Sequence, residues 1–370
     1  MKTSFRLLFG CILAATVNCG VAATNPADLA PAAVLSIMER VADWQLANPS
    51  RHRQTDWTQG AGDAGFMALA RLSSSPRFEE AMIRKGETNE WQLGPRIYHA
   101  DDHVVGQAYC ELFFKSKEDR MIAPLRTRFD YILENPRHFE TLDFTQRRIG
   151  DLWSWCDALF MAPPTWVRLW KATGKEQYLE FAITNWWRTS DYLYDKEEHL
   201  YFRDSTYFNK REANGRKVFW SRGNGWVMGG LVRVMEHLTP GHAARGRFEQ
   251  QFKEMADAIL RCQQPDGLWR SSLLDPESYP LKETSGSGFH TYALAWGINN
   301  GLLERQRFER AVRKAWSALA ACVNEDGKLT HVQPIGADPK KFDPESTEIY
   351  GVGAFLLAGS EMHRLLSSRP

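Results

Sequence analysis

Apolar residues recur along the chain at the three- and four-residue spacing of amphipathic helices rather than in the strict alternation of strands. Eleven such stretches cover residues 32–46, 62–72, 104–114, 123–133, 157–170, 177–194, 225–238, 248–262, 289–303, 308–323 and 351–365. Some are rich in Gly and Ala, such as GNGWVMGGLVRVM, and others are charged and end in turn signals such as QPDGLW. The pattern therefore predicts an all-α fold with two kinds of helix.

Helices rich in small residues can approach one another closely and are predicted to lie inside, whereas charged amphipathic helices are predicted to lie outside. The recognised stretches and some weaker ones indicate about six inner–outer hairpins, each one unit of a helical repeat. Closing the units into a ring gives an (α/α)6 barrel, and leaving them open gives an α-solenoid. We favour the barrel because chemically suggestive residues recur just before, or within, the first turn of the predicted inner helices.

The N-terminus has the pattern of an export signal. Lys2 and Arg6 precede an apolar stretch over residues 7–17, which is followed by small residues up to Ala23. We therefore predict a signal peptide over residues 1–23 and a periplasmic or secreted protein. No Pro/Ser-rich linker divides the rest of the chain, so residues 24–370 are predicted to form a single barrel domain.

Charge and composition exclude several classes of protein. The 46 Lys and Arg residues nearly balance the 45 Asp and Glu residues, which argues against a nucleic-acid binder but not against a small anionic ligand. Beyond the N-terminus no apolar run is long enough to cross a membrane. No HExxH, EF-hand, GxGxxG or P-loop motif occurs, so we predict no metal and no nucleotide cofactor. The four cysteines of the mature chain are isolated and are predicted to be free buried thiols: Cys110, Cys156, Cys262 and Cys322. The sequence leaves the oligomeric state open.

Polar residues with chemical potential stand at the predicted starts of inner helices. They are Asp101 and Asp102 in YHADDHVVGQ, Asp157 in WSWCDALFMAPP, Asp204 in LYFRDSTYF, Arg222 and Asn224 in FWSRGNGW, Ser285–Ser287 in ETSGSGF, and Glu348 in STEIYGVG. Asp, Asn and Ser are also the preferred N-caps, so each acid, amide or hydroxyl has a purely structural alternative. Tryptophans flank several of them, and a helix cap needs no aromatic neighbour. The combination suggests a sugar-binding mouth.

Several segments in order resemble a known family. WSWCDALFMAPP, FWSRGNGWV, QQPDGLWR, ETSGSGF and TEIYGVGAFLLAGSE are similar to the unsaturated glycuronyl hydrolases, above all the unsaturated rhamnogalacturonyl hydrolases of glycoside hydrolase family 105, which is related to family 88. The resemblance runs from about Ala32 to the C-terminus. It implies an (α/α)6 barrel and removal of a 4,5-unsaturated uronic acid from the non-reducing end of oligosaccharides that lyases produce. In that family an Asp protonates C4, water adds at C5, and the resulting hemiketal collapses and expels the neighbouring sugar.

The resemblance also implies roles for individual acids. Asp157 matches the general acid/base of the family, and its apolar neighbours are expected to raise its pKa toward that of a proton donor. The second acid, which orients the substrate, falls in the DDH segment. We choose Asp102 and keep Asp101 in reserve because adjacent aspartates cannot be told apart by alignment.

The same comparison implies binding residues. Arg222 matches a substrate-contacting position and suits a carboxylate, Trp226 matches a stacking position, and Trp220 is a weaker contact. Some relatives have a His where this chain has Arg203, before Asp204, so Arg203 is a candidate second cation for an anionic or sulfated substrate. Three histidines are further candidates at the mouth: His99, His103 and His290.

Two other classes of function remain open on sequence alone. The first is a conventional inverting glycosidase on the same barrel, with two carboxylates flanking a sugar bond and a water molecule. The second is a carbohydrate-binding protein without activity, which the presence of both acids argues against. Within the favoured class, unsaturated galacturonyl-rhamnose from pectin and unsaturated glucuronyl-rhamnose from algal sulfated polysaccharides both fit.

Overall fold

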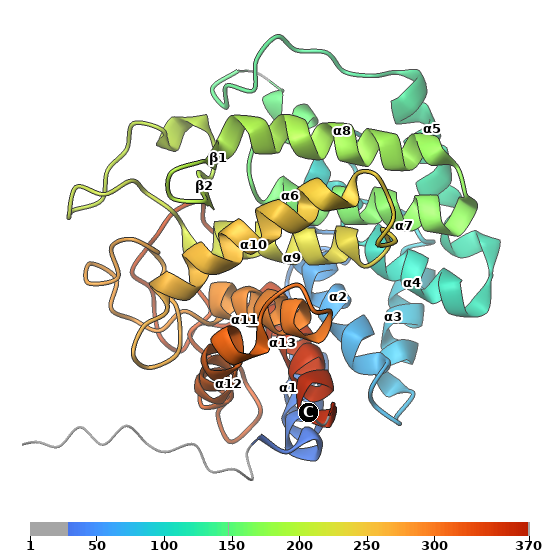
Figure 1. Ribbon diagram of the computed structural model, residues 1–370. Coiled ribbons are helices and arrows are strands. Elements are labelled where there is room, and N and C mark those ends of the chain that lie inside the picture. The colour runs from blue at the N-terminus through green and yellow to red at the C-terminus, as the bar shows by residue number, and fades with distance from the viewer. Residues whose placement is uncertain (1–28, 147, 369–370) are drawn as a thin grey trace, which may run out of the picture.

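Helices make up nearly all the regular structure of the chain (Figure 1). The computed structural model describes residues 29–146 and 148–368, so the predicted signal peptide lies outside the described residues. The α-helices are α1 (Pro31–Ala47), α2 (Trp57–Ala70), α3 (Arg77–Thr88), α4 (Gly106–Ser116), α5 (Ala123–Glu134), α6 (Ala158–Met161), α7 (Pro163–Thr173), α8 (Glu176–Leu193), α9 (Ser221–Met235), α10 (Arg245–Cys262), α11 (Thr284–Asn299), α12 (Arg305–Ala320) and α13 (Ile349–Ser367). Four 3-10 helices are η2 (Ala100–His103), η3 (Asp119–Met121), η4 (Ile149–Leu152) and η5 (Ser205–Tyr207). Two short antiparallel strands, β1 (Tyr194–Asp195) and β2 (Leu200–Tyr201), form one hairpin.

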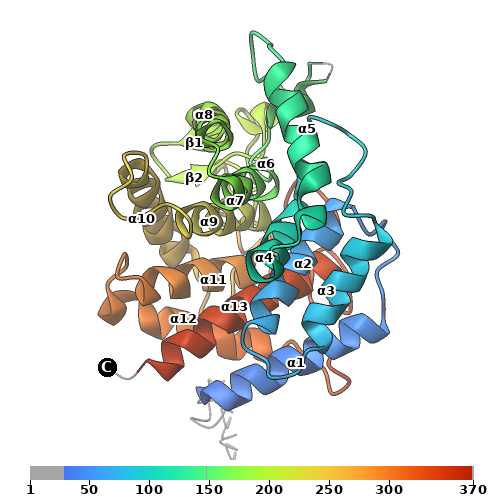
Figure 2. The same cartoon turned by 90° about the vertical axis from the view of Figure 1, so that its right-hand side faces the viewer.

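The inner helices form a closed ring. Helix α2 packs against α4, α4 against α7, α7 and the short α6 against α9, α9 against α11, and α11 against α13, which returns to α2 (Figure 2). Helices α1, α3, α5, α8, α10 and α12 each precede an inner helix in the chain and lie outside the ring. The return of α13 to α2 confirms the (α/α)6 barrel and rules out the open solenoid.

The structure adds α3 to the predicted set, divides the stretch predicted over residues 157–170 into α6 and α7, and starts three other helices earlier. Helix α3 was missed because its buried side consists of only Phe78, Met82 and Gly86 among charged residues. Helices α2, α9 and α11 begin four or five residues before the stretches predicted from residues 62, 225 and 289. Their first turns are polar and aromatic, so apolar periodicity does not detect them. This places Arg222 and Ser285 inside helices rather than in the loops before them.

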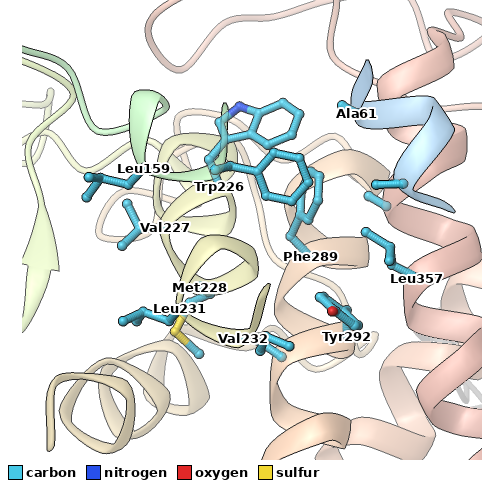
Figure 3. Close-up of a cluster of buried hydrophobic side chains, with 14 of the residues drawn as sticks. Ala61, Leu159, Trp226, Val227, Met228, Leu231, Val232, Phe289, Tyr292 and Leu357 are labelled. Atoms are coloured by element: carbon cyan, nitrogen blue, oxygen red, sulfur yellow. The ribbon is translucent and has the colours of Figure 1, made fainter. Parts of the chain in front are cut away.

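Small residues allow the inner helices to pack closely, as predicted. A Cβ atom on Gly65 of α2 would collide with the backbone of Gly353 in α13, so glycine is required where the ring closes. Every residue of α9 is buried, and its apolar side chains interdigitate with those of α11 (Figure 3). All four cysteines outside the first 28 residues are free thiols, and only Cys262 is partly exposed. No helix in the described part of the chain is long and apolar enough to span a bilayer.

One carboxylate links four of the inner helices at the end of the barrel where they terminate. Glu111 of α4 accepts from Arg71 at the end of α2 (2.7 Å), Arg168 of α7 (3.0 Å) and Arg233 of α9 (2.6 Å). These guanidinium groups hold the pKa of Glu111 well below its usual range, although burial acts in the opposite direction. Cations are also favourable here because helix C-termini carry partial negative charge. The cluster therefore fixes the relative positions of α2, α4, α7 and α9.

Replacing Glu111 by Gln should destabilise the protein strongly, because it leaves buried arginines without their counter-charge. Removing one partner of a buried ion pair typically costs about 3–5 kcal/mol of unfolding free energy. Glu79→Gln is the matched control, since Glu79 pairs with the exposed Lys115 on the surface and should contribute about 0–1 kcal/mol. Denaturant unfolding measures both variants. Equal stabilities for the two would contradict the role assigned to Glu111.

Candidate active site

The candidate residues gather at the mouth formed by the N-terminal ends of the inner helices. Trp57 begins α2, Asp101 and Asp102 lie in η2 before α4, Asp157 precedes α6, Arg222 and Ser285 lie in the first turns of α9 and α11, and Glu348 is the N-cap residue of α13. Side-chain contacts join these elements across the mouth. The Nη1 atom of Arg222 lies 3.4 Å from the hydroxyl of Ser285, and the rings of Trp57 and Tyr350 stack 5.2 Å apart. Because the ring is closed, residues from all around it face one site.

Asp157 lies at this mouth with a side chain that is only 13% exposed. The thiol of Cys156 donates to its Oδ2 atom (3.3 Å), and the Nε atom of Arg203 lies 3.9 Å from the same oxygen. Burial raises the pKa of Asp157, and the charges of Arg203 and Arg222 and the Cys156 hydrogen bond offset only part of that increase. A carboxyl group in this setting keeps its proton to a higher pH than an exposed aspartate does, which suits a proton donor.

The two adjacent aspartates have different surroundings. Asp102 is 5% exposed and is held by Arg96, whose Nε (3.0 Å) and Nη2 (2.8 Å) atoms and backbone N–H all donate to it. Asp101 is 18% exposed and makes longer contacts, 3.6 Å to Nδ1 of His99 and 3.7 Å to Arg96. Burial raises the pKa of Asp101 to about 7, and the negative charges of Asp157 and Asp102 add to that increase. Asp101 is therefore the carboxyl group that is coupled to Asp157, whereas Asp102 holds the loop.

Arg222, the predicted stacking residue Trp226 and the weaker candidate Trp220 belong to the barrel interior. Arg222 is fully buried, and its Nη1 and Nη2 atoms donate to the carbonyls of Gln333 (2.6 Å) and Pro334 (3.0 Å). Trp226 has no exposed surface, because it packs among Phe160, Trp57, Tyr350 and Phe289. Figure 3 shows its indole beside Phe289. Trp220 is also buried and donates from Nε1 to Gln333 (2.9 Å). Contrary to our expectation, neither indole has an open face on which a sugar could stack in this structure.

Arg203 and Asp204 lie on the loop beside Asp157. Asp204 is buried, caps η5 through the N–H of Thr206 (2.8 Å) and accepts from Nη1 of Arg203 (2.6 Å). Its contacts are those of a positioning residue rather than of a direct ligand. Arg203 is partly exposed, and its guanidinium lies over the ring of Phe144 (4.6 Å). A cation is thus held next to the candidate acid.

The three candidate histidines also differ in exposure. His99 is half-buried, and its ring centroid lies 4.7 Å from that of Trp155. Burial and the charges of nearby arginines lower the pKa of His99 to about 4, so its imidazole is neutral at pH 7. His103 is buried, with Nε2 2.8 Å from the carbonyl of Ile97, and His290 is buried beside Ser221. Only His99 therefore lies at the mouth with part of its surface accessible.

Comparison with known proteins identifies the family to which the chain belongs. The family model described as Glycosyl Hydrolase Family 88 matches residues 32–366. The chain belongs to this family. It is therefore a glycoside hydrolase, and the resemblance seen in its sequence motifs is confirmed.

The curated relatives are named as hydrolases, and the solved relatives include a hydrolase and a lyase. The family 88 chain is 40% identical to an unsaturated 3S-rhamnoglycuronyl hydrolase of Formosa agariphila, over 89% of this chain and 90% of that protein. It is 36% identical to a protein of the same name from an Alteromonas species, over 88% of this chain and 84% of that one. A solved family 88 glycosyl hydrolase from Bacteroides vulgatus is 31% identical with a TM-score of 0.83, covering 91% of this chain and 100% of that one. A solved polysaccharide lyase is equally similar, at 32% identity, a TM-score of 0.83 and coverage of 92% and 99%.

Sequence analysis of this family 88 enzyme missed several residues that shape the site. Arg96 was not singled out, although it binds Asp102, because their contact depends on a reversal of the chain between them. Glu283 was also missed: it is the residue that caps α11, accepting from the N–H groups of Ser285 and Gly286. Cys156 was noted only as an isolated thiol. Glutamate is not a preferred N-cap, so no sequence signal marked Glu283.

A second cavity lies at the opposite end of the barrel. It has a volume of about 1200 Å³ and is lined by ends of inner helices, including Arg71, Glu111, Arg168 and Glu236. Arg71 and Arg168 pair there with Glu111, whereas burial raises the pKa of Glu361 in the same lining. Within residues 29–146 and 148–368, no group of three or more His, Cys, Asp or Glu side chains is arranged to hold a metal ion.

The two adjacent aspartates should respond differently to substitution by Asn. Asp101→Asn should lower activity strongly with little change in melting temperature, because Asp101 has no short ion pair to lose. Asp102→Asn should lower the melting temperature, because it removes the buried counter-charge of Arg96. Thermal melting and steady-state kinetics on the same preparations measure both effects. The reverse pattern would assign the second acid to Asp102.

Proposed function

We propose that this family 88 enzyme removes a 4,5-unsaturated uronic acid from the non-reducing end of oligosaccharides, with Asp157 as general acid and base. The observation that carries the proposal is the pair of coupled carboxyl groups, Asp157 and Asp101, beside Arg203 at one mouth. Two acids whose pKa values are raised by burial suit proton transfer, and the cation suits a uronate. The names of the curated relatives support the same substrate class.

The proposed reaction adds water across the double bond. Asp157 delivers its proton to C4, a water molecule attacks C5, and Asp157 takes a proton from that water as the C5–O bond forms. The product is a hemiketal at C5. Its ring opens, the resulting hemiacetal at C1 collapses, and the neighbouring sugar leaves with its hydroxyl group restored. Asp101 and its neighbour His99 orient the sugar and the attacking water in this scheme.

The architecture favours an anionic sugar at this mouth. Each inner helix directs its N-terminus toward the mouth, and helix N-termini carry partial positive charge and free N–H groups. Arg203 and Arg222 add full positive charges near Asp157. The formal net charge of the whole chain is only +1, so the overall charge attracts an anion very little. Attraction for the substrate therefore comes from the charges at this end of the barrel.

We propose that the sugar following the unsaturated uronic acid is rhamnose, and that the uronic acid is an unsaturated glucuronyl unit, as in oligosaccharides from algal sulfated polysaccharides. The support is the shared name of the two curated relatives, both unsaturated 3S-rhamnoglycuronyl hydrolases, at 40% and 36% identity over most of the chain. The pectin-derived galacturonyl-rhamnose is the alternative within the same reaction. A panel of both unsaturated disaccharides, with and without 3-sulfate on rhamnose, distinguishes them.

Purified enzyme should lower the ultraviolet absorbance of an unsaturated glucuronyl-rhamnose disaccharide. Asp157→Asn should slow this decrease by about 10²–10⁴-fold. The amide cannot donate the proton, which is what general acid–base catalysis of this size depends on. The melting temperature serves as the folding control, since the exchange preserves shape. Asp157 would lose its assigned role if the Asn variant kept more than about a tenth of the wild-type rate.

One comparison favours a second candidate function, β-elimination at a 4-linked uronic acid. The solved polysaccharide lyase matches this chain as well as the solved hydrolase does. Elimination moves a proton from C5 and breaks the bond at C4, so it uses the same region of the sugar and creates the double bond that hydration removes. The two reactions have opposite readouts: a lyase raises the ultraviolet absorbance of a saturated 4-linked uronide, and the proposed hydrolase lowers that of an unsaturated one.

We also propose that the enzyme is exported. The support is the pattern of Lys2, Arg6, the apolar stretch over residues 7–17 and the small residues up to Ala23. Expression of the full chain with cell fractionation and N-terminal sequencing should yield a mature protein that begins near Thr24. A cytoplasmic protein with an intact N-terminus would contradict export.

A further inference from the structure

The two arginines near Asp157 differ in how many of their donors are already used. Arg222 is fully buried, and both of its terminal nitrogens donate to backbone carbonyls. Arg203 is 18% exposed, and within residues 29–146 and 148–368 its side chain makes a single hydrogen bond, from Nη1 to Asp204. Its Nε atom is buried and has no hydrogen-bond partner among those residues. The Nε atom of Arg222 is likewise buried without a partner, so the difference lies in the terminal nitrogens and in exposure. Among the described residues Nη2 of the partly exposed Arg203 makes no hydrogen bond, whereas both terminal nitrogens of the buried Arg222 are used.

The guanidinium of Arg203 is held in place before any substrate binds. Asp204 fixes one edge at 2.6 Å, and the ring of Phe144 lies 4.6 Å from its centre. The backbone carbonyl of Arg203 accepts from the N–H of Cys156 (2.8 Å), which ties this loop to the residue next to Asp157. A group positioned in advance loses little conformational entropy when a ligand binds.

We propose that Arg203 binds the carboxylate of the unsaturated uronic acid and that this contact determines when Asp157 carries the proton it delivers. The inference rests on the proposed function, because it assumes that the substrate is such a uronic acid. The carboxylate is attached to C5, the direct neighbour of the carbon that receives the proton. A cation 3.9 Å from the proton donor is therefore within reach of the donor and of the carboxylate together.

The electrostatic consequence follows from charge neutralisation. In the free enzyme, Arg203 lowers the pKa of Asp157 against the effect of burial, and so favours the ionised form that cannot donate. A carboxylate paired with Arg203 cancels that charge, so the pKa of Asp157 rises as the substrate binds. The acid then becomes protonated when its substrate is in place.

Other charged and titratable groups surround the pair and remain the same in every variant below. Around Asp157 they are Arg222 on α9, Cys156 on its own loop, Asp101 on η2 and Tyr207 on η5. Around Asp101 they are Arg96, Asp102 and His99. Because Asp101 and Asp157 interact, an observed titration belongs to the pair. A shift between variants that differ only at Arg203 still isolates the effect of Arg203.

The binding half of the proposal is tested with an unsaturated disaccharide as free acid and as methyl ester. Wild type should prefer the acid by about 100-fold or more in kcat/KM, since losing one partner of a close charge pair has effects of this size. Arg203→Gln should abolish the preference, mainly by raising KM for the acid. Arg203→Lys should recover part of it, because it keeps the charge and loses the planar fork. Arg211→Gln, an exposed arginine on the same loop, should behave as wild type.

The protonation half is tested by pH profiles, because kcat/KM reports the free enzyme and kcat the enzyme–substrate complex. For wild type on the free acid, the alkaline pKa should be higher in kcat than in kcat/KM. Arg203→Gln should raise the alkaline pKa of kcat/KM toward the wild-type value in kcat. If Arg203 only supported the fold, Arg203→Gln would change neither this pKa nor the preference for acid over ester.

The outcomes separate the inference from the function on which it rests. Loss of the acid preference and an upward shift of the pKa in Arg203→Gln support the proposal. A Gln variant that melts normally, keeps the acid preference and shows no shift of this pKa overturns the proposal. Wild-type activity on the unsaturated disaccharide would then still support the proposed function. If the Gln variant has a lowered melting temperature, the Arg203→Lys variant is the deciding one. Full acid preference in the Lys variant would contradict the planar contact. A wild-type enzyme that leaves the acid and the ester unchanged overturns the proposed function itself.

Discussion

The contact between the first and last inner helices, α2 and α13, determines where every site residue lies. Gly65 and Gly353 let the two backbones meet, and a side chain at either position would force the ring open. Closure brings Trp57 and Tyr350, which are nearly 300 residues apart in the sequence, into a stacked pair at the mouth. It also brings Arg222 of α9 into contact with the loop before α13. The mouth exists because the ring closes.

Glu111 at one end of the barrel and the Asp157–Asp101 pair at the other differ in how much positive charge surrounds them. At the C-terminal end Glu111 is surrounded by three arginines, so it stays ionised and its contribution is structural. At the N-terminal end Asp157 and Asp101 are buried with too little compensating charge, and their pKa values rise. Incomplete compensation costs stability, but it raises the pH at which these carboxyl groups release their protons, which suits proton transfer. The Glu111 ion cluster at the C-terminal end stabilises the fold. This stability offsets the cost of the incompletely compensated acids at the N-terminal end.

The sequence predicted the architecture well because the fold depends on a repeated local pattern. Helix periodicity and the alternation of small-residue and charged helices predicted the barrel, and turn residues located most helix ends. The motifs also directed attention to the mouth at which the candidate acids lie. Helix α3 escaped detection because few of its residues are buried, and the starts of α2, α9 and α11 escaped because their first turns are polar and aromatic.

What each candidate residue contacts could not be read from the sequence. Choosing between Asp101 and Asp102 requires knowing that Arg96 folds back onto Asp102. The tryptophan at position 226 fits a stacking motif, yet helix packing turns it into the core between Phe160 and Phe289. Arg222 and Arg203 look equivalent as isolated cations. Only the tertiary contacts show that both terminal nitrogens of Arg222 are held by carbonyls and that Nη2 of the partly exposed Arg203 has no partner among the described residues.

The most direct test of the account uses a thio-linked analogue of the unsaturated glucuronyl-rhamnose disaccharide. Sulfur at the glycosidic position resists cleavage at the anomeric carbon by acid catalysis, but it leaves the C4=C5 double bond open to hydration. We predict that wild type consumes the ultraviolet absorbance of the thio-linked compound at a rate comparable to the oxygen-linked one, and that Asp157→Asn does not. An enzyme that cleaves the oxygen-linked disaccharide and leaves the absorbance of the thio-linked one unchanged would contradict hydration by Asp157 and point to a conventional glycosidase.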